Sequence, residues 1–239
     1  MRELHVYDEG IDIWRALEER WRLLARRAID EKGFFTVALS GGRTPVGFYC
    51  FLSRIKGLPW SETELFQVDE RQVPPGSEES NFRMIRSSLL EGGQVRPRGI
   101  HSVRTDTGDA ADSALEYEKE LRAFFGGTGG WPAFDLVLLG IGADSHTASL
   151  FPGGSELAEK KRWVVASRPE KAAHQRVTIT LPVINTAGNV VLVATGGGKA
   201  KAVRSLWEGG ADPSRPASLV RPGKGVLAIY VDRQAGACR

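Results

Sequence analysis

Residues 134–139 restrict the possible folds of this chain more than any other segment, because five of these six residues are apolar. Apolar side chains that follow one another without alternation need cover on both faces of a strand. Strands of this kind are typical of parallel sheets that lie between two layers of helices. A glycine-containing turn at residues 140–142 follows directly and ends the predicted strand.

The rest of the chain alternates short apolar runs with segments of helical periodicity. The apolar runs predict strands at residues 34–39, 65–68, 163–166, 176–180, 190–195 and 226–231. Apolar side chains at three- and four-residue steps predict helices at residues 10–29, 46–55, 80–90, 110–125 and 199–207. Ser80 is placed to cap the third of these helices.

This order of elements predicts the fold class. We expect an α/β fold with a mainly parallel, doubly wound, Rossmann-like sheet and helices on both of its faces. The best candidate for a domain boundary is the glycine-rich segment 126–130, and five residues are too few to favour two domains. We therefore expect a single domain over residues 1–239.

Charge and composition exclude several classes of protein. The chain has 32 basic and 29 acidic residues, a formal net charge of +3, without a block of like charges, so we expect no nucleic-acid partner. This small positive excess is compatible with a small anionic substrate. No apolar run approaches the roughly 20 residues that cross a membrane, and the N-terminal residues lack the apolar core of a signal peptide. We therefore expect no membrane partner and a cytoplasmic location.

The chain has two cysteines, Cys50 and Cys238. Cys50 lies in an apolar setting, and Cys238 is next to the last residue. Two cysteines in such positions provide neither a disulfide framework nor a cysteine metal site. We expect both to be free thiols.

Four polar or glycine-rich segments follow predicted strands, at residues 40–45, 69–74, 140–152 and 195–199. In open parallel sheets the carboxyl ends of the strands meet at one edge, and ligands bind there. Gly41, Gly42 and Thr44 offer backbone N–H groups and a hydroxyl at a helix start, which suits a phosphate. A tight turn between strand and helix also needs glycine for steric reasons, so this segment alone leaves both interpretations open. Neither a Walker loop nor a Gly-x-Gly-x-x-Gly pattern is present, which disfavours nucleotide binding.

His146 is the candidate for acid–base chemistry. It lies two residues after Asp144 among small residues that leave room for a ligand, and an imidazole exchanges a proton near neutral pH. A loop histidine without a chemical role is the alternative. The other histidines, His5, His101 and His174, lack such a setting, and we interpret them as surface or structural residues. No set of histidines has metal-ligand spacing, so we expect no metal site.

Charged side chains stand at two other strand ends. Arg71 has a guanidinium that can bind a phosphate through two N–H groups, and Asp69 and Glu70 precede it. A solvated turn with a local ion pair is the alternative for this segment. Lys199, which follows three glycines, would add a second cation.

Together these segments resemble the 6-phosphogluconolactonase family. The family pattern Ser-Gly-Gly-x-Thr-Pro is matched at residues 40–45, and Asp-Glu-Arg-x-Val-Pro is matched at residues 69–74, with Ser-Asn following at residues 80–81. The pattern Gly-x-Gly-x-Asp-Gly-His-Thr-Ala-Ser-Leu-Phe-Pro is matched at residues 140–152 at every specified position except one. Two residues differ from the commonest form of these patterns. Arg43 stands where serine is frequent, and Ser145 replaces a glycine that a positive φ would favour.

The resemblance implies an enzyme that hydrolyses 6-phospho-D-glucono-1,5-lactone to 6-phospho-D-gluconate without a cofactor or metal. The partner would be this phosphorylated sugar lactone, and the enzyme would be a monomer. His146 would act as the general base toward water, and Asp144 would orient it. The substrate-binding residues would be Gly41, Gly42, Thr44, Asp69, Arg71, Arg176 and Lys199.

Two alternatives share the fold. Glucosamine-6-phosphate deaminase carries an acidic residue shortly after the equivalent histidine, whereas this chain has Ser-Leu-Phe-Pro at residues 149–152. A non-catalytic sugar-phosphate sensor would keep the phosphate loop, and such sensors usually carry a DNA-binding segment. Only one helix fits before residue 34, so the sequence favours the lactonase over both alternatives.

Overall fold

The computed structural model describes residues 1–126, 130–169 and 173–237. Its centre is a seven-stranded sheet in which every pair of neighbouring strands is parallel, with the order β1-β10-β9-β6-β2-β3-β5. These strands are β1 (Arg2–Tyr7), β2 (Phe35–Leu39), β3 (Thr63–Gln67), β5 (Gly99–His101), β6 (Leu136–Gly140), β9 (Asn189–Ala194) and β10 (Val226–Asp232). The prediction of a mainly parallel sheet is confirmed. The two edge strands, β1 and β5, were not predicted.

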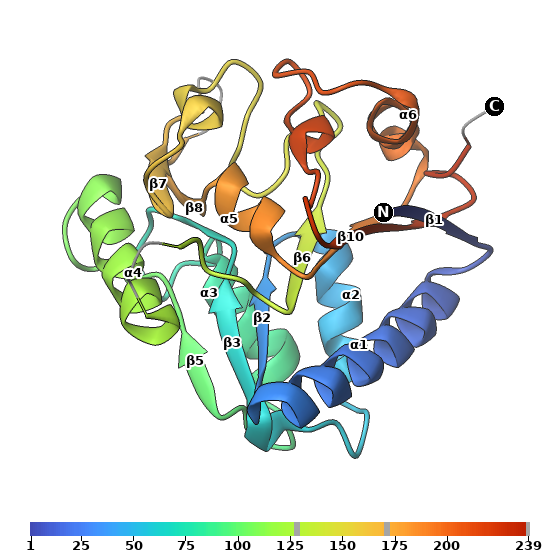
Figure 1. The fold of residues 1–239 in the computed structure, drawn as a ribbon, viewed down its shortest axis with the longest axis horizontal. Coiled ribbons are helices and arrows are strands. Elements are labelled where there is room, and N and C mark those ends of the chain that lie inside the picture. The colour runs from blue at the N-terminus through green and yellow to red at the C-terminus, as the bar shows by residue number, and fades with distance from the viewer. Residues whose placement is uncertain (127–129, 170–172, 238–239) are drawn as a thin grey trace.

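Helices cover both faces of this sheet, as predicted. One buried apolar cluster joins the sheet to α1 (Gly10–Lys32), α2 (Arg43–Leu52), α3 (Asn81–Ile85) and the π-helical turn Arg86–Leu90. The other joins it to α4 (Ala110–Phe125), α5 (Leu181–Thr186) and α6 (Ala200–Glu208). In Figure 1 strands β3, β2 and β6 stand between α4 on the left and α2 on the right. Short 3₁₀ turns complete the structure at Trp60–Glu62, Ser155–Ala158, Gly197–Lys199 and Pro216–Leu219.

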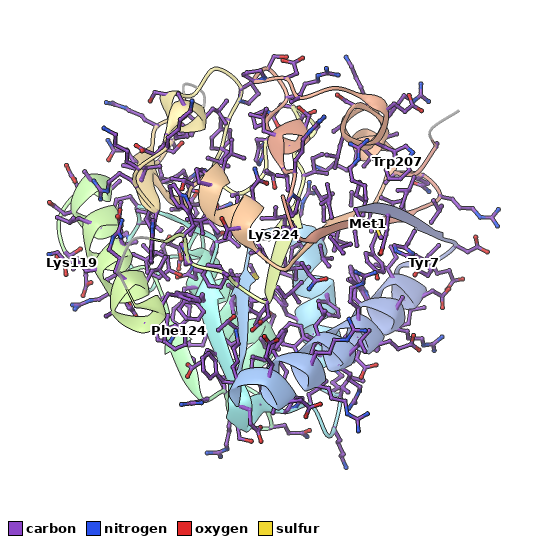
Figure 2. The ribbon with its side chains drawn as sticks, in the orientation of Figure 1. Met1, Tyr7, Lys119, Phe124, Trp207 and Lys224 are labelled. Carbon is purple, nitrogen blue, oxygen red and sulfur yellow. The ribbon has the colours of Figure 1, made fainter. Side chains whose placement is uncertain are left out.

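The amphipathic pattern of α4 explains how it packs. Figure 2 shows Phe124 on the side of α4 that faces the sheet and Lys119 on the outward side. Phe124 packs against Phe66 of β3 with ring centroids 5.1 Å apart. Asp109 caps the start of the helix by accepting hydrogen bonds from the N–H groups of Ala111 and Asp112. The Asp109 cap and the buried apolar face therefore both stabilise α4.

A second, three-stranded antiparallel sheet lies beyond the carboxyl ends of the main strands. It has the order β4-β8-β7, with β4 (Asp69–Arg71), β7 (Val164–Ser167) and β8 (Arg176–Ile179). Figure 1 shows β7 and β8 in the upper half, toward which the arrows of β2 and β3 point. The sequence predicted two of these strands but not that they form a separate sheet. It also placed a strand end at Asp69, whereas the chain continues there as β4 because β8 supplies backbone partners.

Four remaining expectations concern the domain boundary, the cysteines, the number of domains and membrane-spanning helices. Gly126 ends α4, with its N–H donating to the carbonyl of Arg122, but most of the segment 126–130 lies outside the described residues. Cys238 also lies outside them, and Cys50 is a half-buried free thiol on α2. A single domain over residues 1–239 stays a prediction. Within the described ranges, no helix is long and apolar enough to cross a membrane.

Candidate active site

A cavity of about 470 Å³ opens at the carboxyl ends of β2, β6 and β9. This volume is within the usual range for small-molecule sites. The cavity lies where the sheet order changes direction between β2 and β6, the position at which open α/β sheets bind ligands. All four segments singled out in the sequence contribute to its wall. The predicted site residues that line it are Gly41, Gly42, Thr44, Asp69, Arg71, His146 and Lys199.

The loop after β2 packs closely against Asn81, and both Gly41 and Gly42 stand at positions that favour glycine. A Cβ atom on Gly41 would lie 2.1 Å from the side-chain oxygen of Asn81, so any other residue there would displace the Asn81 side chain. Gly42 has a φ of 112°, which only glycine adopts without strain. The hydroxyls of Thr44 and Thr195 are 3.3 Å apart, which joins this loop to the loop after β9. Both loops therefore face the same end of the cavity.

His146 is held in a defined orientation by Asp144. Nδ1 of His146 lies 2.6 Å from Oδ1 of Asp144, and the ring packs against Phe151 with centroids 4.7 Å apart. Gly142 leaves room for the imidazole, because a Cβ there would lie 2.1 Å from Nδ1. Since Nδ1 is engaged by the carboxylate, Nε2 is the ring nitrogen left for a ligand. Asp144 is not itself among the residues that line the cavity.

The electrostatics of Asp144 fit this arrangement. Partial burial raises the pKa of the Asp144 carboxyl. The charge of His146 and the hydrogen bonds that His146 donates lower this pKa by a larger amount, so the net shift is downward. The carboxyl group is therefore ionised at neutral pH. An ionised carboxylate at Nδ1 favours the tautomer whose Nε2 can accept a proton.

The inner wall of the cavity is polar and buried. Asp69 is 8% exposed, and its Oδ2 accepts a hydrogen bond of 2.7 Å from the hydroxyl of Ser149. Burial raises the pKa of Asp69, and the hydrogen bond from Ser149 only partly opposes this shift. Ser40 also lines the cavity and is 3% exposed, and its Oγ has no hydrogen-bond partner among the residues described. The sequence motif contained Ser40, but nothing in the sequence indicated that its hydroxyl is buried without a partner.

Arg71 is fixed by the link between β4 and α3. The carboxylate of Glu70 is almost fully buried and accepts hydrogen bonds from the N–H groups of Asn81 at 2.6 Å and Phe82 at 2.7 Å. Arg71 donates to the side-chain oxygen of Asn81 at 2.8 Å and to the carbonyl of Glu79 at 2.6 Å. This geometry excludes the alternative of a solvated turn. Asn81 itself lines the cavity, a role that the sequence did not single out.

Arg176 and Lys199 differ in position. Arg176 pairs with Arg71 across β4 and β8 but is not among the cavity-lining residues, and its Nη1 is buried without a hydrogen-bond partner in the described ranges. Burial and the charge of Arg71 lower the pKa of Arg176. Lys199 does line the cavity. Burial lowers its pKa, the charge of Asp144 opposes this shift, and the charge of Arg43 reinforces it.

The other three histidines lie outside the cavity, as expected for structural or surface residues. His101 contacts Glu120 and Glu64 at 2.7 and 3.2 Å, His5 contacts Glu3 at 3.2 Å, and His174 contacts Glu79 at 2.9 Å. In the part of the chain that the structure describes, no group of three or more His, Cys, Asp or Glu side chains is placed to hold a metal ion.

Residues 9–229 match the family model of glucosamine-6-phosphate isomerases and 6-phosphogluconolactonase. A 6-phosphogluconolactonase from Synechocystis is 40% identical over 212 residues, which cover 88% of this chain and 87% of that protein. The solved 6-phosphogluconolactonase from Trypanosoma cruzi is 27% identical, with a TM-score of 0.87 over 99% of this chain and 96% of that chain. A solved monomeric glucosamine-6-phosphate deaminase is 20% identical, with a TM-score of 0.76 over 99% and 100% of the two chains, which shows a common fold alone.

Proposed function

The chain belongs to the family of glucosamine-6-phosphate isomerases and 6-phosphogluconolactonases, and we propose that it hydrolyses 6-phospho-D-glucono-1,5-lactone to 6-phospho-D-gluconate. The observation that carries this proposal is the pair His146 and Asp144 at a cavity whose wall also holds Arg71 and Lys199. A base and two cations in one cavity suit an acyl group that water attacks and a phosphate that anchors it.

The reaction is acyl transfer to water. Nε2 of His146 accepts a proton as a water molecule attacks the lactone carbonyl carbon, and a tetrahedral oxyanion forms. Collapse of this intermediate breaks the bond to the ring oxygen, and the imidazolium returns the proton to that oxygen. Asp144 holds the ring in the required tautomer and stabilises the imidazolium. The lactone carbonyl is already electrophilic, so the reaction as proposed uses an activated water and hydrogen-bond donors to the oxyanion.

The phosphate of the substrate binds between the two loops that Thr44 and Thr195 join. Gly41, Gly42, Thr44 and Lys199 line the cavity, and we expect their backbone N–H groups, hydroxyl and ammonium to contact the phosphate. Arg71 adds a guanidinium from the second sheet, and Arg176 adds positive potential from the neighbouring strand.

The sugar hydroxyls bind at the inner wall. Asp69 offers a carboxylate oxygen there, and the neighbouring Ser40 has a buried hydroxyl without a partner in the described chain. Contacts with several hydroxyls on one face of the ring would orient the lactone carbonyl toward His146.

The proposal includes the setting of the enzyme. We infer a monomer, as the resemblance to the family implies. We also infer a cytoplasmic location, because a phosphorylated sugar is an anion that does not cross an apolar bilayer. Light scattering on the purified protein would measure the oligomeric state.

The test is lactone hydrolysis with substrate generated freshly from glucose 6-phosphate, measured against the spontaneous rate. We expect wild type to exceed that rate, and His146→Ala to lose about 10²- to 10⁴-fold in kcat/KM, because general acid–base groups supply that much. His5→Gln is the matched control, because His5 lies on β1 at the far edge of the sheet and should leave kcat/KM unchanged.

Three other outcomes would refute the role of His146 or give the protein a different function. A folded His146→Ala protein with the wild-type kcat/KM would refute the role of His146. If wild type binds 6-phosphogluconate but does not exceed the spontaneous rate, the protein is a sensor. Release of ammonia from glucosamine 6-phosphate would make it a deaminase.

A further inference from the structure

Arg43 is a cavity residue that the proposed reaction does not use. It is the first residue of α2, directly after Gly42, and its exposed side chain lines the cavity. Within the described ranges its guanidinium makes no ion pair and no hydrogen bond. An arginine presents five N–H donors in a rigid fork, and all of those on Arg43 remain available to a ligand.

The position of Arg43 is electrostatically unfavourable in the absence of an anion. The N-terminus of a helix carries partial positive charge, so a cation there costs rather than gains free energy. Lys199, from the loop after β9, adds a second cation close enough for Arg43 to lower its pKa. The contact between Thr44 and Thr195 holds these two loops together. The free protein therefore keeps two cations and a helix N-terminus at one end of the cavity.

We propose that Arg43 is a specificity-determining residue that binds the substrate phosphate together with Lys199 and so strengthens the preference of this chain for phosphorylated over unphosphorylated lactones. This inference rests on the proposed function for the identity of the substrate. A dianionic phosphate can take N–H donors from the Arg43 guanidinium and the Lys199 ammonium at the same time. Serine, which is frequent at this position in the related pattern, offers one neutral hydroxyl instead.

The first test measures binding without turnover. We expect Arg43→Ser to weaken the affinity for 6-phosphogluconate and for inorganic phosphate about 10-fold, as measured by titration calorimetry. Arg43→Lys keeps the charge and should recover most of this loss. Arg54→Ser removes an arginine near the other end of α2, where the side chain is exposed and does not line the cavity, and should bind both anions like wild type.

The second test separates the phosphate from the lactone. Arg43→Ser should raise KM for the phosphorylated lactone about 10-fold and leave kcat/KM for unphosphorylated glucono-1,5-lactone unchanged. The melting temperature of the ligand-free variant should equal or exceed that of wild type, because a cation is removed from a helix N-terminus and from the neighbourhood of Lys199. A residue with a purely structural role would instead lower the melting temperature and affect both substrates alike.

The outcomes distinguish this inference from the proposed function. Unchanged anion affinity in Arg43→Ser, or an equal loss in Arg54→Ser, overturns the role of Arg43. Anion binding that depends on Arg43 in a protein that hydrolyses no lactone supports the role of Arg43 and overturns the proposed reaction. If wild type binds neither anion, both proposals are wrong.

Discussion

At the scale of single residues, Ser145 shows how the loop that holds His146 is shaped. Its φ is 67°, a left-handed conformation that glycine adopts without strain and serine does not. Three hydrogen bonds hold this conformation: the N–H of Gly142 donates to His146, that of Ser145 to Gly142, and that of Ala217 to the carbonyl of Ser145. The backbone is therefore fixed by its surroundings rather than by the preference of the residue, and the departure from glycine leaves His146 in contact with Asp144.

This interpretation predicts the effect of restoring the glycine. Ser145→Gly should raise the free energy of unfolding by up to about 1 kcal/mol, because relief of left-handed strain slightly exceeds the entropy that glycine adds to the unfolded chain. The value of kcat/KM should stay within about threefold of wild type. Urea unfolding and lactone hydrolysis are the measurements.

A β-branched residue provides the contrast. Ser145→Val should destabilise the protein by more than 1 kcal/mol, since valine tolerates a positive φ less well than serine. If Ser145→Gly were instead less stable than wild type, the Ser145 side chain would stabilise the folded state by more free energy than its left-handed backbone costs.

At the scale of secondary-structure elements, Glu70 joins β4 to α3. Besides the N–H groups of Asn81 and Phe82, its carboxylate accepts from the hydroxyl of Ser80 and the side-chain amide of Gln67, each at 3.0 Å. Ser80 also caps α3 by accepting from the N–H of Arg83, as the sequence predicted. A short helix is thereby stabilised by a buried anion, and the same contacts place Asn81 and Arg71 at the cavity.

Glu70→Gln tests this link. The amide nitrogen of glutamine is a donor, so it would face donors that the carboxylate now satisfies. We expect a loss of about 2–4 kcal/mol in the free energy of unfolding and a lower kcat/KM, as Arg71 and Asn81 lose their support.

The matched control removes an exposed cap. Asp109→Ala should cost about 1 kcal/mol and leave kcat/KM unchanged, because Asp109 caps α4 far from the cavity. A loss in Glu70→Gln no larger than that in Asp109→Ala would show that the buried carboxylate does not hold the two elements together.

At the scale of the whole molecule, His101 ties the edge of the seven-stranded sheet to α4. It lies on β5, stacks on Phe66 with ring centroids 4.2 Å apart, and contacts Glu120 of α4 and Glu64 of β3. Burial lowers the pKa of the imidazole, but hydrogen bonds to the two carboxylates outweigh burial and raise the pKa above its ordinary value. The charged imidazole therefore favours the folded state.

The sign of the resulting pH dependence follows from this raised pKa. The unfolded imidazole has a pKa of about 6.5, so the stabilisation is complete below that pH and is lost as pH rises through the higher pKa of the folded state. His101→Gln should remove it. The difference in free energy of unfolding between wild type and His101→Gln should therefore shrink from pH 6 to pH 9.

The size of this change is set by partial exposure. We expect a few tenths to about 1 kcal/mol, the range of ion pairs that are not fully buried. Because His5, His146 and His174 also contact carboxylates, the difference between the two proteins is the quantity to measure, rather than the slope of wild type alone. A difference that is constant over this pH range would refute the role of His101.

The sequence by itself determined the class of fold and the position of the chemistry. Largely apolar runs such as residues 134–139 require cover on both faces, and the helices predicted between the runs supply it, so a parallel sheet between helices follows from local pattern. Polar and glycine-rich segments at strand ends converge in any such sheet, which is why four distant segments could be assigned to one site before their contacts were known.

Only the tertiary structure decided which of these residues contact one another, because local periodicity does not predict how distant segments pair. The antiparallel sheet of β4, β8 and β7 depends on β4, whose partner strand β8 lies about one hundred residues further along the chain. The same long-range packing sets Arg176 away from the cavity lining, buries Glu70, and leaves Ser40 and Arg43 at the cavity without partners in the described chain. Residue type and spacing indicate what chemistry is present, but burial and distance determine which groups are free to carry it out.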